Sequence, residues 1–505
     1  MPYLMGIDAG TQSLRCCLFD LEGRLIRRAS QAYPTYQPRS GWVEQNVQDW
    51  LDALTAAVAG AIGESGVRAE DIVALSYACT SCTVVALDDG ARPLRPAIMW
   101  MDERAWRQAE RVSASGHPVL RYAGGKESPQ WMLPKAMWLA ENEPEVFRRA
   151  RWIVEQTDLL TYHLTGRFTI SRSNAAAKWH YVTPLGGWPY DLLRNLGLEV
   201  LMAKWPAEVL PVGTPLGPVS KAFAEATGLS PRTLVVQGGV DSHAAMVGVG
   251  AVRQGDMALI IGTSTCHMAQ SSTPIFADVW GPYPEAVADG IFTLGGGQST
   301  TGSIIQWLVE NVGCGHVSYQ QMDELASRIP PGSEGLVALD FFQGNRTPFK
   351  DPLARGAIWG LTLRHGLPHI YRAFCEAVAY GTRAIVDNLE EHDYHVERFL
   401  AAGGGAKSRL WMQIHADVSG RPVQLSTTDE PTALGAAIWA GIGAGIFRDY
   451  FEAAGRMVRH GMVLTPDEKV GRVYDFYYRQ YIETYHHLKP LMEAVAKYEE
   501  QRSAH

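Results

Sequence analysis

Cysteine, positive charge and long apolar runs are all scarce in this chain of 505 residues. Its seven cysteines are an odd number, and only Cys79 and Cys82 form a CxxC pair, so neither a disulfide framework nor a zinc site is expected. The formal net charge of −8 leaves no basic surface for nucleic acid. The longest apolar run, residues 433–447, is too short to cross a bilayer, and no targeting signal precedes Gly6. The sequence therefore predicts a cytoplasmic protein that binds neither nucleic acid nor membranes, and a neutral small molecule suits it better as a partner than an anion.

The length of the chain predicts two large domains, because one hydrophobic core rarely serves so many residues. We place the boundary between residues 250 and 251. Residues 4–8 form an apolar run followed by a turn and then a second strand, whereas a P-loop or Rossmann site would pass from its glycines into a helix. This order favours the antiparallel opening of actin-like and hexokinase-like ATPases. An apolar strand and a GTS turn early in the second half indicate a duplicated core with a cleft between the copies.

Two turns rich in glycine and hydroxyl residues are predicted to bind phosphate, because each offers backbone N–H groups and hydroxyls to an anion. They are the DAGTQS turn, with Gly10, Thr11, Gln12 and Ser13, and the later turn of Gly262, Thr263 and Ser264. Asp8, at the start of the first turn, is suited to Mg²⁺, directly or through water. An ordinary hairpin turn is the alternative for the first, and GTS is a common tripeptide. Their matching positions after apolar strands favour the phosphate interpretation.

Three further features of the sequence indicate a catalytic base, a pocket lysine and a ligand-binding loop. Asp241, in GGVDSHAAM, is suited to take a proton from an attacking hydroxyl, although aspartate is also a common helix cap. Lys178 follows a run of small residues and is predicted to point into a pocket, although most lysines face water. Gly404, Gly405 and Ala406 stand between a predicted strand and helix and permit close approach of a phosphate or flat ring, with a flexible turn as the alternative. A polyphosphate clamp with a carboxylate is the chemistry of an ATP-dependent kinase acting on a hydroxyl.

From Met5 to about Val470 the chain resembles the FGGY carbohydrate kinases. The resemblance rests on GIDAGTQS, IMWMDERA, GGVDSHAAM, IGTSTC, GGGQSTTG, AAGGGAKSRLWMQIHADVSGRPV and the stretch from Gly356 to Glu376. It implies an α/β fold of two ribonuclease-H-like domains of the actin/hexokinase superfamily, with an interdomain cleft. Residues 1–250 would bind the sugar and carry the first phosphate loop, and residues 251–505 would bind the nucleotide. ATP and Mg²⁺ follow as cofactors, and a homodimer is a reasonable expectation.

The resemblance also implies roles for single residues. Asp241 matches the catalytic base, Gly10, Thr11, Gly262 and Thr263 match the phosphate loops, and Gly404, Gly405 and Ala406 match the adenosine site. CTSCTVVALD and GGQS are most similar to ribulokinase-type pentulose kinases, which implies sugar contacts from Cys79, Thr80, Ser81, Lys178 and Gln298. A side chain on Gly405 is expected to crowd the nucleotide. A substrate glutamate of some ribulokinases falls at Gly295, where the glycine is expected to leave open space.

The expected reaction is transfer of the γ-phosphoryl group of MgATP to a terminal hydroxyl of a ribulose-like ketopentose, with Asp241 as the base. Two alternatives stay open. One is a xylulose, glycerol or tetritol kinase of the same family. The other is an actin-like or chaperone-like ATPase whose nucleotide cycle drives a partner.

Overall fold

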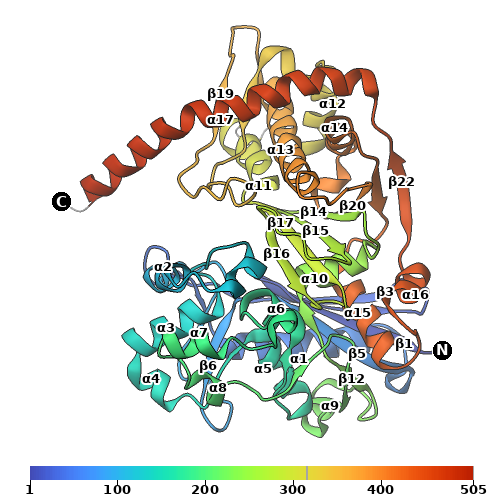
Figure 1. The fold of residues 1–505 in the computed structure, drawn as a ribbon. Helices are drawn as coiled ribbons and strands as arrows, with labels where there is room; N and C mark the ends of the chain where they lie inside the picture. Colours follow the sequence, from blue (N-terminus) through green and yellow to red (C-terminus); the bar gives the residue numbers. More distant parts are fainter. Residues whose placement is uncertain (314, 316, 504–505) are drawn as a thin grey trace.

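A computed structural model describes residues 1–313, 315 and 317–503 (Figure 1). Two mixed seven-stranded sheets form its framework. The first sheet contains β11 (Pro215–Pro218), β12 (Leu234–Val236), β5 (Ile72–Cys79), β1 (Tyr3–Ala9), β2 (Ser13–Phe19) and β3 (Leu25–Ala32), with β13 (Gly239–Val240) paired to β5. The second contains β16 (Trp280–Pro284), β17 (Phe292–Gln298), β15 (Thr265–Ser271), β14 (Asp256–Ile261), β20 (Arg398–Ala402), β21 (Val423–Ser426) and β22 (His460–Leu464).

The two sheets share one pairing pattern. In the first, β1, β2 and β3 form an antiparallel meander, and β1 and β5, then β5 and β12, pair in parallel. In the second, β14, β15 and β17 form the meander, and β14 and β20, then β20 and β21, pair in parallel. The predicted antiparallel opening and the repeated core are therefore confirmed. Because β1 and β14 occupy equivalent places, the turns that follow them are equivalent as well.

Helices cover the sheets (Figure 1). Those that position the site are α1 (Val47–Gly63), α6 (Arg172–Lys178), α10 (Asp241–Gly248), α11 (Gly302–Trp307), α13 (Leu367–Glu390), α14 (Arg409–Ser419), α15 (Pro431–Gly443), α16 (Tyr450–Met457) and α17 (Glu468–Ser503). The segment from residue 101 to 209 also carries α2 (Trp106–Ala114), α3 (Met132–Asn142), α4 (Pro144–Arg149), α5 (Gln156–Thr165), α7 (Tyr190–Asn195), α8 (Leu201–Lys204) and the strand β8 (Trp152–Glu155). No helix in the described part of the chain combines the length and the apolar character that crossing a bilayer requires.

The helix α15 belongs to the second half of the chain but packs against the first sheet and α10. Glycines permit this close packing. A Cβ on Gly6 of β1 would lie 1.8 Å from the carbonyl oxygen of Ala433, and one on Gly435 would lie 1.9 Å from that of Ala244 in α10. Backbone thus lies directly against backbone at both contacts. Helix α15 therefore connects β1, the strand that leads into the first turn, with α10, and holds α10 and its first residue Asp241 in place.

Candidate active site

The turn between β1 and β2 is held by backbone and side-chain hydrogen bonds. The Gly10 N–H donates to the Ser13 carbonyl oxygen at 3.1 Å. Gln45 Nε2 donates to the Thr11 carbonyl oxygen at 2.6 Å, and Trp100 Nε1 donates to Thr11 Oγ1 at 2.9 Å. A Cβ on Gly10 would meet no atom closer than 3.5 Å. The packing of the chain itself therefore does not demand glycine here, and the absence of a side chain keeps the turn accessible to an anion.

Asp8, the last polar side chain of β1, lies in a buried network of charges. Its Oδ2 accepts a hydrogen bond from Arg15 Nη2 at 2.6 Å, and Arg15 Nη1 also lies 3.4 Å from Glu430 Oε2. Burial raises the pKa of Asp8 to about 6, Arg15 opposes that rise, and the negative charge of Glu430 adds to it. A group poised in this way binds a cation readily, because the cation replaces the proton.

The turn between β14 and β15 has a similar internal contact, from a glycine N–H to a serine carbonyl oxygen, with one residue fewer between the two. The Gly262 N–H donates to the Ser264 carbonyl oxygen at 2.9 Å, while Gly262 and Thr263 are exposed. The start of α11 closes over this turn, since the N–H groups of Thr301 and Gly302 donate to the Thr263 and Gly262 carbonyl oxygens, both at 3.0 Å. The turn is therefore rigid on one side and open on the other.

Asp241 begins α10, directly after β13. Its neighbour Val240 pairs with Cys79 at the end of β5, so the carboxylate lies at the carboxyl edge of the parallel strands, where open α/β sheets bind ligands. The Ser242 N–H donates to Asp241 Oδ1 at 2.6 Å. Burial raises the pKa of Asp241 to about 7, and the negative charge of Asp8 contributes to the rise. The two carboxylates are thus neighbours, and Asp241 exchanges its proton near neutral pH.

Lys178, at the end of α6, points into a group of aromatic rings. Its Nζ lies 4.7 Å from the ring centroid of Trp131, 4.9 Å from that of Trp280 and 5.4 Å from that of Tyr283. Burial works to lower the pKa of Lys178, but Tyr283 and Cys82 outweigh it and raise that pKa. The Tyr283 hydroxyl has no hydrogen-bond partner of normal geometry among the described residues, so it raises the pKa of Lys178 through its proximity. The lysine stays charged among aromatic faces, where a substrate oxygen can reach it.

The three consecutive residues predicted to contact a sugar differ in accessibility. Cys79 is fully buried, and burial raises the pKa of its thiol well above the usual value. Thr80 is almost buried, and its Oγ1 lies 3.0 Å from Thr83 Oγ1 and donates to Gln156 Oε1 at 3.3 Å. Only Ser81 is partly exposed. Of the three, Ser81 alone offers an accessible side chain, and all three roles stay predictions.

Gln298, at the end of β17, uses its amide within the protein. Its Nε2 donates to Asp340 Oδ2 and to the Val378 carbonyl oxygen, both at 2.9 Å, and its Oε1 accepts from Thr382 at 3.1 Å. Both amide hydrogens are occupied, which leaves no free donor for a sugar. The predicted contact of Gln298 therefore has no support from these hydrogen bonds.

The glycine-rich loop after β20 adjoins the second turn. Gly403 has φ +95°, and a Cβ there would lie 2.4 Å from the Ile261 carbonyl oxygen. The expectation that a side chain on Gly405 would crowd the nucleotide is wrong. A Cβ on Gly405 would lie 2.3 Å from Ile261 Cγ2 and would collide with the protein itself. Gly404 is exposed with no atom within 4 Å of an added Cβ. Gly404, rather than Gly405, is the position whose missing side chain leaves room for a ligand.

The expectation of open space at Gly295 is also wrong. A Cβ on Gly295 would lie 3.3 Å from Met268 Sδ and 3.5 Å from Trp280 Cε3, and one on Gly297 would lie 2.8 Å from Trp280 Cη2. The Trp280 indole therefore covers both glycines of β17. A large aromatic ring fills the place that a glutamate would take.

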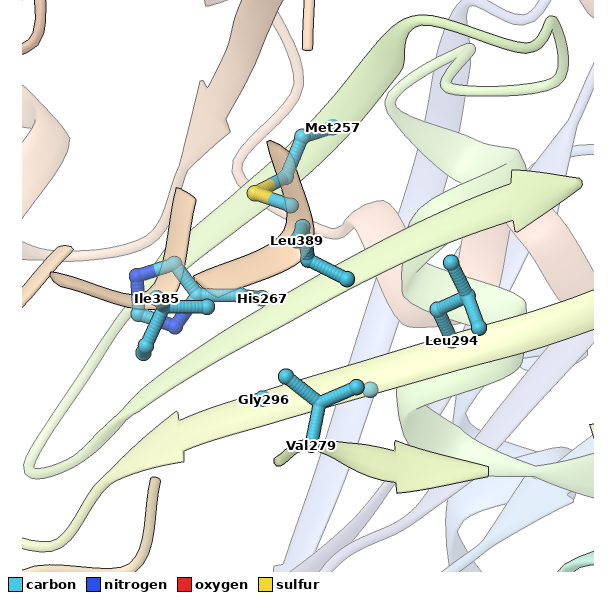
Figure 2. Close-up of a pocket in the computed structure, with 8 residues that line it drawn as sticks. Met257, His267, Val279, Leu294, Gly296, Ile385 and Leu389 are labelled. Atoms are coloured by element: carbon cyan, nitrogen blue, oxygen red, sulfur yellow. The ribbon is translucent and has the colours of Figure 1, made fainter. Parts of the chain in front are cut away.

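Figure 2 shows side chains around a narrow apolar gap between β14, β15, β17 and α13. Met257, Leu294, Ile385 and Leu389 line it together with His267, and it has no room for a water molecule. Burial lowers the pKa of His267 to about 3. The gap is a packing feature of the core and no ligand site.

No cluster of three or more histidine, cysteine, aspartate or glutamate side chains able to hold a metal occurs among residues 1–313, 315 and 317–503. This is compatible with Mg²⁺, which proteins commonly bind through one or two carboxylates together with substrate phosphates. Asp8 is the carboxylate predicted to bind it, and that role stays a prediction.

Sequence reasoning missed four residues that surround these groups, namely Trp100, Trp280, Tyr283 and Arg346. Trp100 links the first turn to the aromatic rings, because its Nε1 donates to Thr11 and the Arg346 guanidinium lies 5.6 Å from its ring centroid. Only Trp100 lies in a quoted motif, IMWMDERA. The others have no local pattern that could have identified them.

Two family comparisons cover most of the chain. Residues 3–248 match the N-terminal domain of the FGGY family of carbohydrate kinases, and residues 257–444 match its C-terminal domain. The chain is 31% identical to the ribulokinase of Anoxybacillus flavithermus, over 99% of this chain and 92% of that protein. It is 27% identical to the xylulose kinase of Bacillus subtilis, over 99% of both. The crystal structure of xylulose kinase from Rhodospirillum rubrum superimposes with a TM-score of 0.88 at 30% identity, covering 97% of this chain and 100% of that one.

Proposed function

This chain belongs to the FGGY family of carbohydrate kinases, which are ATP-dependent enzymes with a two-domain α/β fold, and we propose that it phosphorylates a ketopentose. The transferred group is the γ-phosphoryl group of MgATP, and the acceptor is a terminal hydroxyl of a ribulose-like sugar. The observation that carries this proposal is Asp241, an aspartate whose pKa is raised to about 7, at the carboxyl edge of the first sheet and beside Asp8.

Asp241 takes the proton of the attacking hydroxyl. A general base works best when its pKa lies near the operating pH, and that of Asp241 does. The carboxylate is partly exposed, so a substrate can reach it, while the Ser242 N–H fixes one of its oxygens. The other oxygen is free to accept the proton.

The two equivalent turns hold the phosphates of ATP. Residues 10–13 and 262–264 offer N–H groups and hydroxyls, and Asp8 would hold Mg²⁺ directly or through water. When bound, Mg²⁺ neutralises charge on the transferred phosphoryl group. Gly404, Gly405 and Ala406 contact the adenosine, with the exposed Gly404 nearest to it. In this proposal residues 1–250 form the sugar-binding domain and residues 251–505 form the nucleotide-binding domain.

Lys178 binds a sugar oxygen, and the aromatic rings around it exclude water from the reacting groups. A ketopentose is favoured over glycerol because the rings and the lysine extend the site beyond the Asp241 carboxylate. Xylulose, glycerol and tetritol kinases remain the alternatives within the family.

The experiment is a screen of ketoses and polyols with the purified protein, measuring ADP release in a coupled assay. The proposal expects ADP release that depends on an added ketopentose and a kcat/KM for it above that for glycerol. Glycerol used as efficiently as every ketopentose would refute the substrate class. ATP hydrolysis without any sugar dependence would favour the alternative of an actin-like or chaperone-like ATPase.

We also propose the cytoplasm as the compartment, because the six described cysteines are all free, as is usual in a reducing environment. A homodimer is a further proposal, and light scattering coupled to size-exclusion chromatography tests it.

A further inference from the structure

Arg346, in the loop between β18 (Val337–Leu339) and β19 (Ala357–Trp359), has no charged partner among the residues that the structure describes. No hydrogen bond or ion pair joins its guanidinium to another side chain in the described ranges. Burial lowers the pKa of Arg346, and Cys266 and Glu103 oppose that effect without reaching contact distance. Its guanidinium is half-buried, and its five N–H donors have no acceptor among the described residues, so they are available to the oxygen atoms of a ligand.

Arg346 and Lys178 approach the same indole from the two halves of the chain. The Arg346 guanidinium carbon lies 6.0 Å from the Trp280 ring centroid, and Lys178 Nζ lies 4.9 Å from it. Trp280 in turn packs against Gly295 and Gly297, which have no side chains to displace it. The two positive charges are close enough that Arg346 opposes the rise in the pKa of Lys178. Neither has a carboxylate partner among the described residues, so oxygen atoms of a ligand would stabilise both.

The position of these cations relative to Asp241 follows from Cys266, two residues after the second turn. Burial raises the pKa of the Cys266 thiol to about 12, Asp241 adds to the rise, and Arg346 and Lys178 oppose it. All three charged groups therefore act on this thiol. The pKa of Asp241 itself responds to burial and to Asp8 rather than to either cation. The two cations thus act less on Asp241 than Asp8 does, and both lie beside the Trp280 ring.

We propose that Arg346 is a specificity-determining residue that binds the end of the substrate remote from the phosphorylated hydroxyl. Its planar fork donates to two adjacent oxygens, the 1-hydroxyl and the 2-carbonyl of a ketopentose, while Lys178 contacts the same end from the first half of the chain. This inference rests on the proposed ketopentose kinase function and adds to it the chemistry that the far end of the sugar must present.

The experiment compares a ketopentose with its 1-deoxy analogue of the same configuration, which lacks one of the two oxygens. The variants are Arg346→Gln and Arg346→Lys, with Lys350→Gln as the matched control. Lys350 lies in the same loop and also reaches the first half of the chain, but its Nζ already donates to the Gly124 carbonyl oxygen at 2.8 Å and to Asp278 at 3.1 Å. Steady-state kinetics gives kcat and KM for each sugar and for ATP.

The wild type should prefer the ketopentose to its 1-deoxy analogue by about 10-fold or more in kcat/KM, because a charged donor left unpaired is costly. Arg346→Gln should raise the KM for the ketopentose by about 10- to 100-fold and reduce that preference to about threefold or less, with the KM for ATP changed by less than about threefold. Arg346→Lys, which keeps the charge and loses the fork, should lose most of the preference too. Lys350→Gln should keep it.

Three results would overturn the assignment. One is an equal loss on both sugars, and another is a raised KM for ATP with a lowered kcat, which would place Arg346 on the phosphoryl group. The third is an unchanged preference in Arg346→Lys, which decides the matter even if Arg346→Gln fails to fold. A wild type that uses ketopentoses while the variants keep its preference refutes this inference alone. A wild type that phosphorylates no ketopentose refutes the proposed function, and this inference with it.

Discussion

Replacing Asp241 by asparagine should abolish turnover and stabilise the protein at the same time. Asparagine keeps the oxygen that accepts from the Ser242 N–H, so the local geometry is preserved. It cannot take a proton from the substrate, and loss of a general base typically lowers the rate by ~10²–10⁴-fold. It also removes a carboxylate that is charged at a partly buried position near Asp8.

The gain in stability follows from the raised pKa. A rise from 3.8 to about 7 corresponds to an upper bound of roughly 4 kcal/mol, at about 1.4 kcal/mol per pH unit. Asp241 is partly exposed, so solvent screening reduces this to on the order of 1–3 kcal/mol. The folded protein holds the Asp241 proton up to about pH 7, whereas the unfolded chain releases it near pH 3.8. Stability of the wild type therefore falls as the pH rises between these values, and above pH 7 the full cost is present.

The assay combines urea denaturation with steady-state kinetics from pH 5 to pH 8.5. The free energy of unfolding of Asp241→Asn should exceed that of the wild type most at pH 8, and the difference should shrink as the pH falls below 7. The kcat/KM of the wild type should rise with pH and reach half its plateau near pH 7. The exposed Asp89→Asn is the control and should change neither quantity. Turnover of Asp241→Asn within threefold of the wild type, or no gain in stability at pH 8, would refute the reasoning.

Three further predictions concern the nucleotide, the sugar and the metal. Gly404→Ala should leave the melting temperature unchanged yet weaken ATP binding by calorimetry, whereas Gly405→Ala should lower the melting temperature because its Cβ collides with Ile261; normal ATP affinity in a folded Gly404→Ala would remove this loop from the adenosine site. Lys178→Met should raise the KM for the sugar by about 10-fold or more and that for ATP by less than about threefold, since it removes one charged contact; equal effects on both would contradict a sugar role. Removing divalent cations with EDTA should stop turnover until Mg²⁺ is restored, and Asp8→Asn should raise the Mg²⁺ concentration needed for half-maximal rate; an unaltered requirement would exclude Asp8 as a ligand.

Local patterns were sufficient for the framework of the fold. An apolar strand, a glycine-hydroxyl turn and a second strand occur within a few residues, and this order alone predicted that β1 and β2 pair antiparallel. The same order after Asp256 predicted the repeat. Residues adjacent in the chain must be adjacent in space, so patterns of this kind need no knowledge of the tertiary fold.

Contacts between segments that are distant in the chain could not be predicted in this way. The sequence shows glycines at 404 and 405, but only the position of Ile261 decides that one fills a packing contact and the other leaves open space. It shows glycine at 295, but only the fold brings Trp280 over it. In both cases the neighbour comes from another strand, and the register of the sheet determines which atoms meet.

The sequence by itself determined the family, the two equivalent turns and the aspartate suited to act as a base, because each is encoded in a short contiguous motif. Only the tertiary structure decided the surroundings of Asp241 and of Lys178. It buries Asp241 beside Asp8 and so raises the pKa of Asp241, and it brings Arg346 and Lys178 to one indole from segments far apart in the chain. Charge and burial act through space, so a group's proton affinity and its partners are settled only when distant segments pack together.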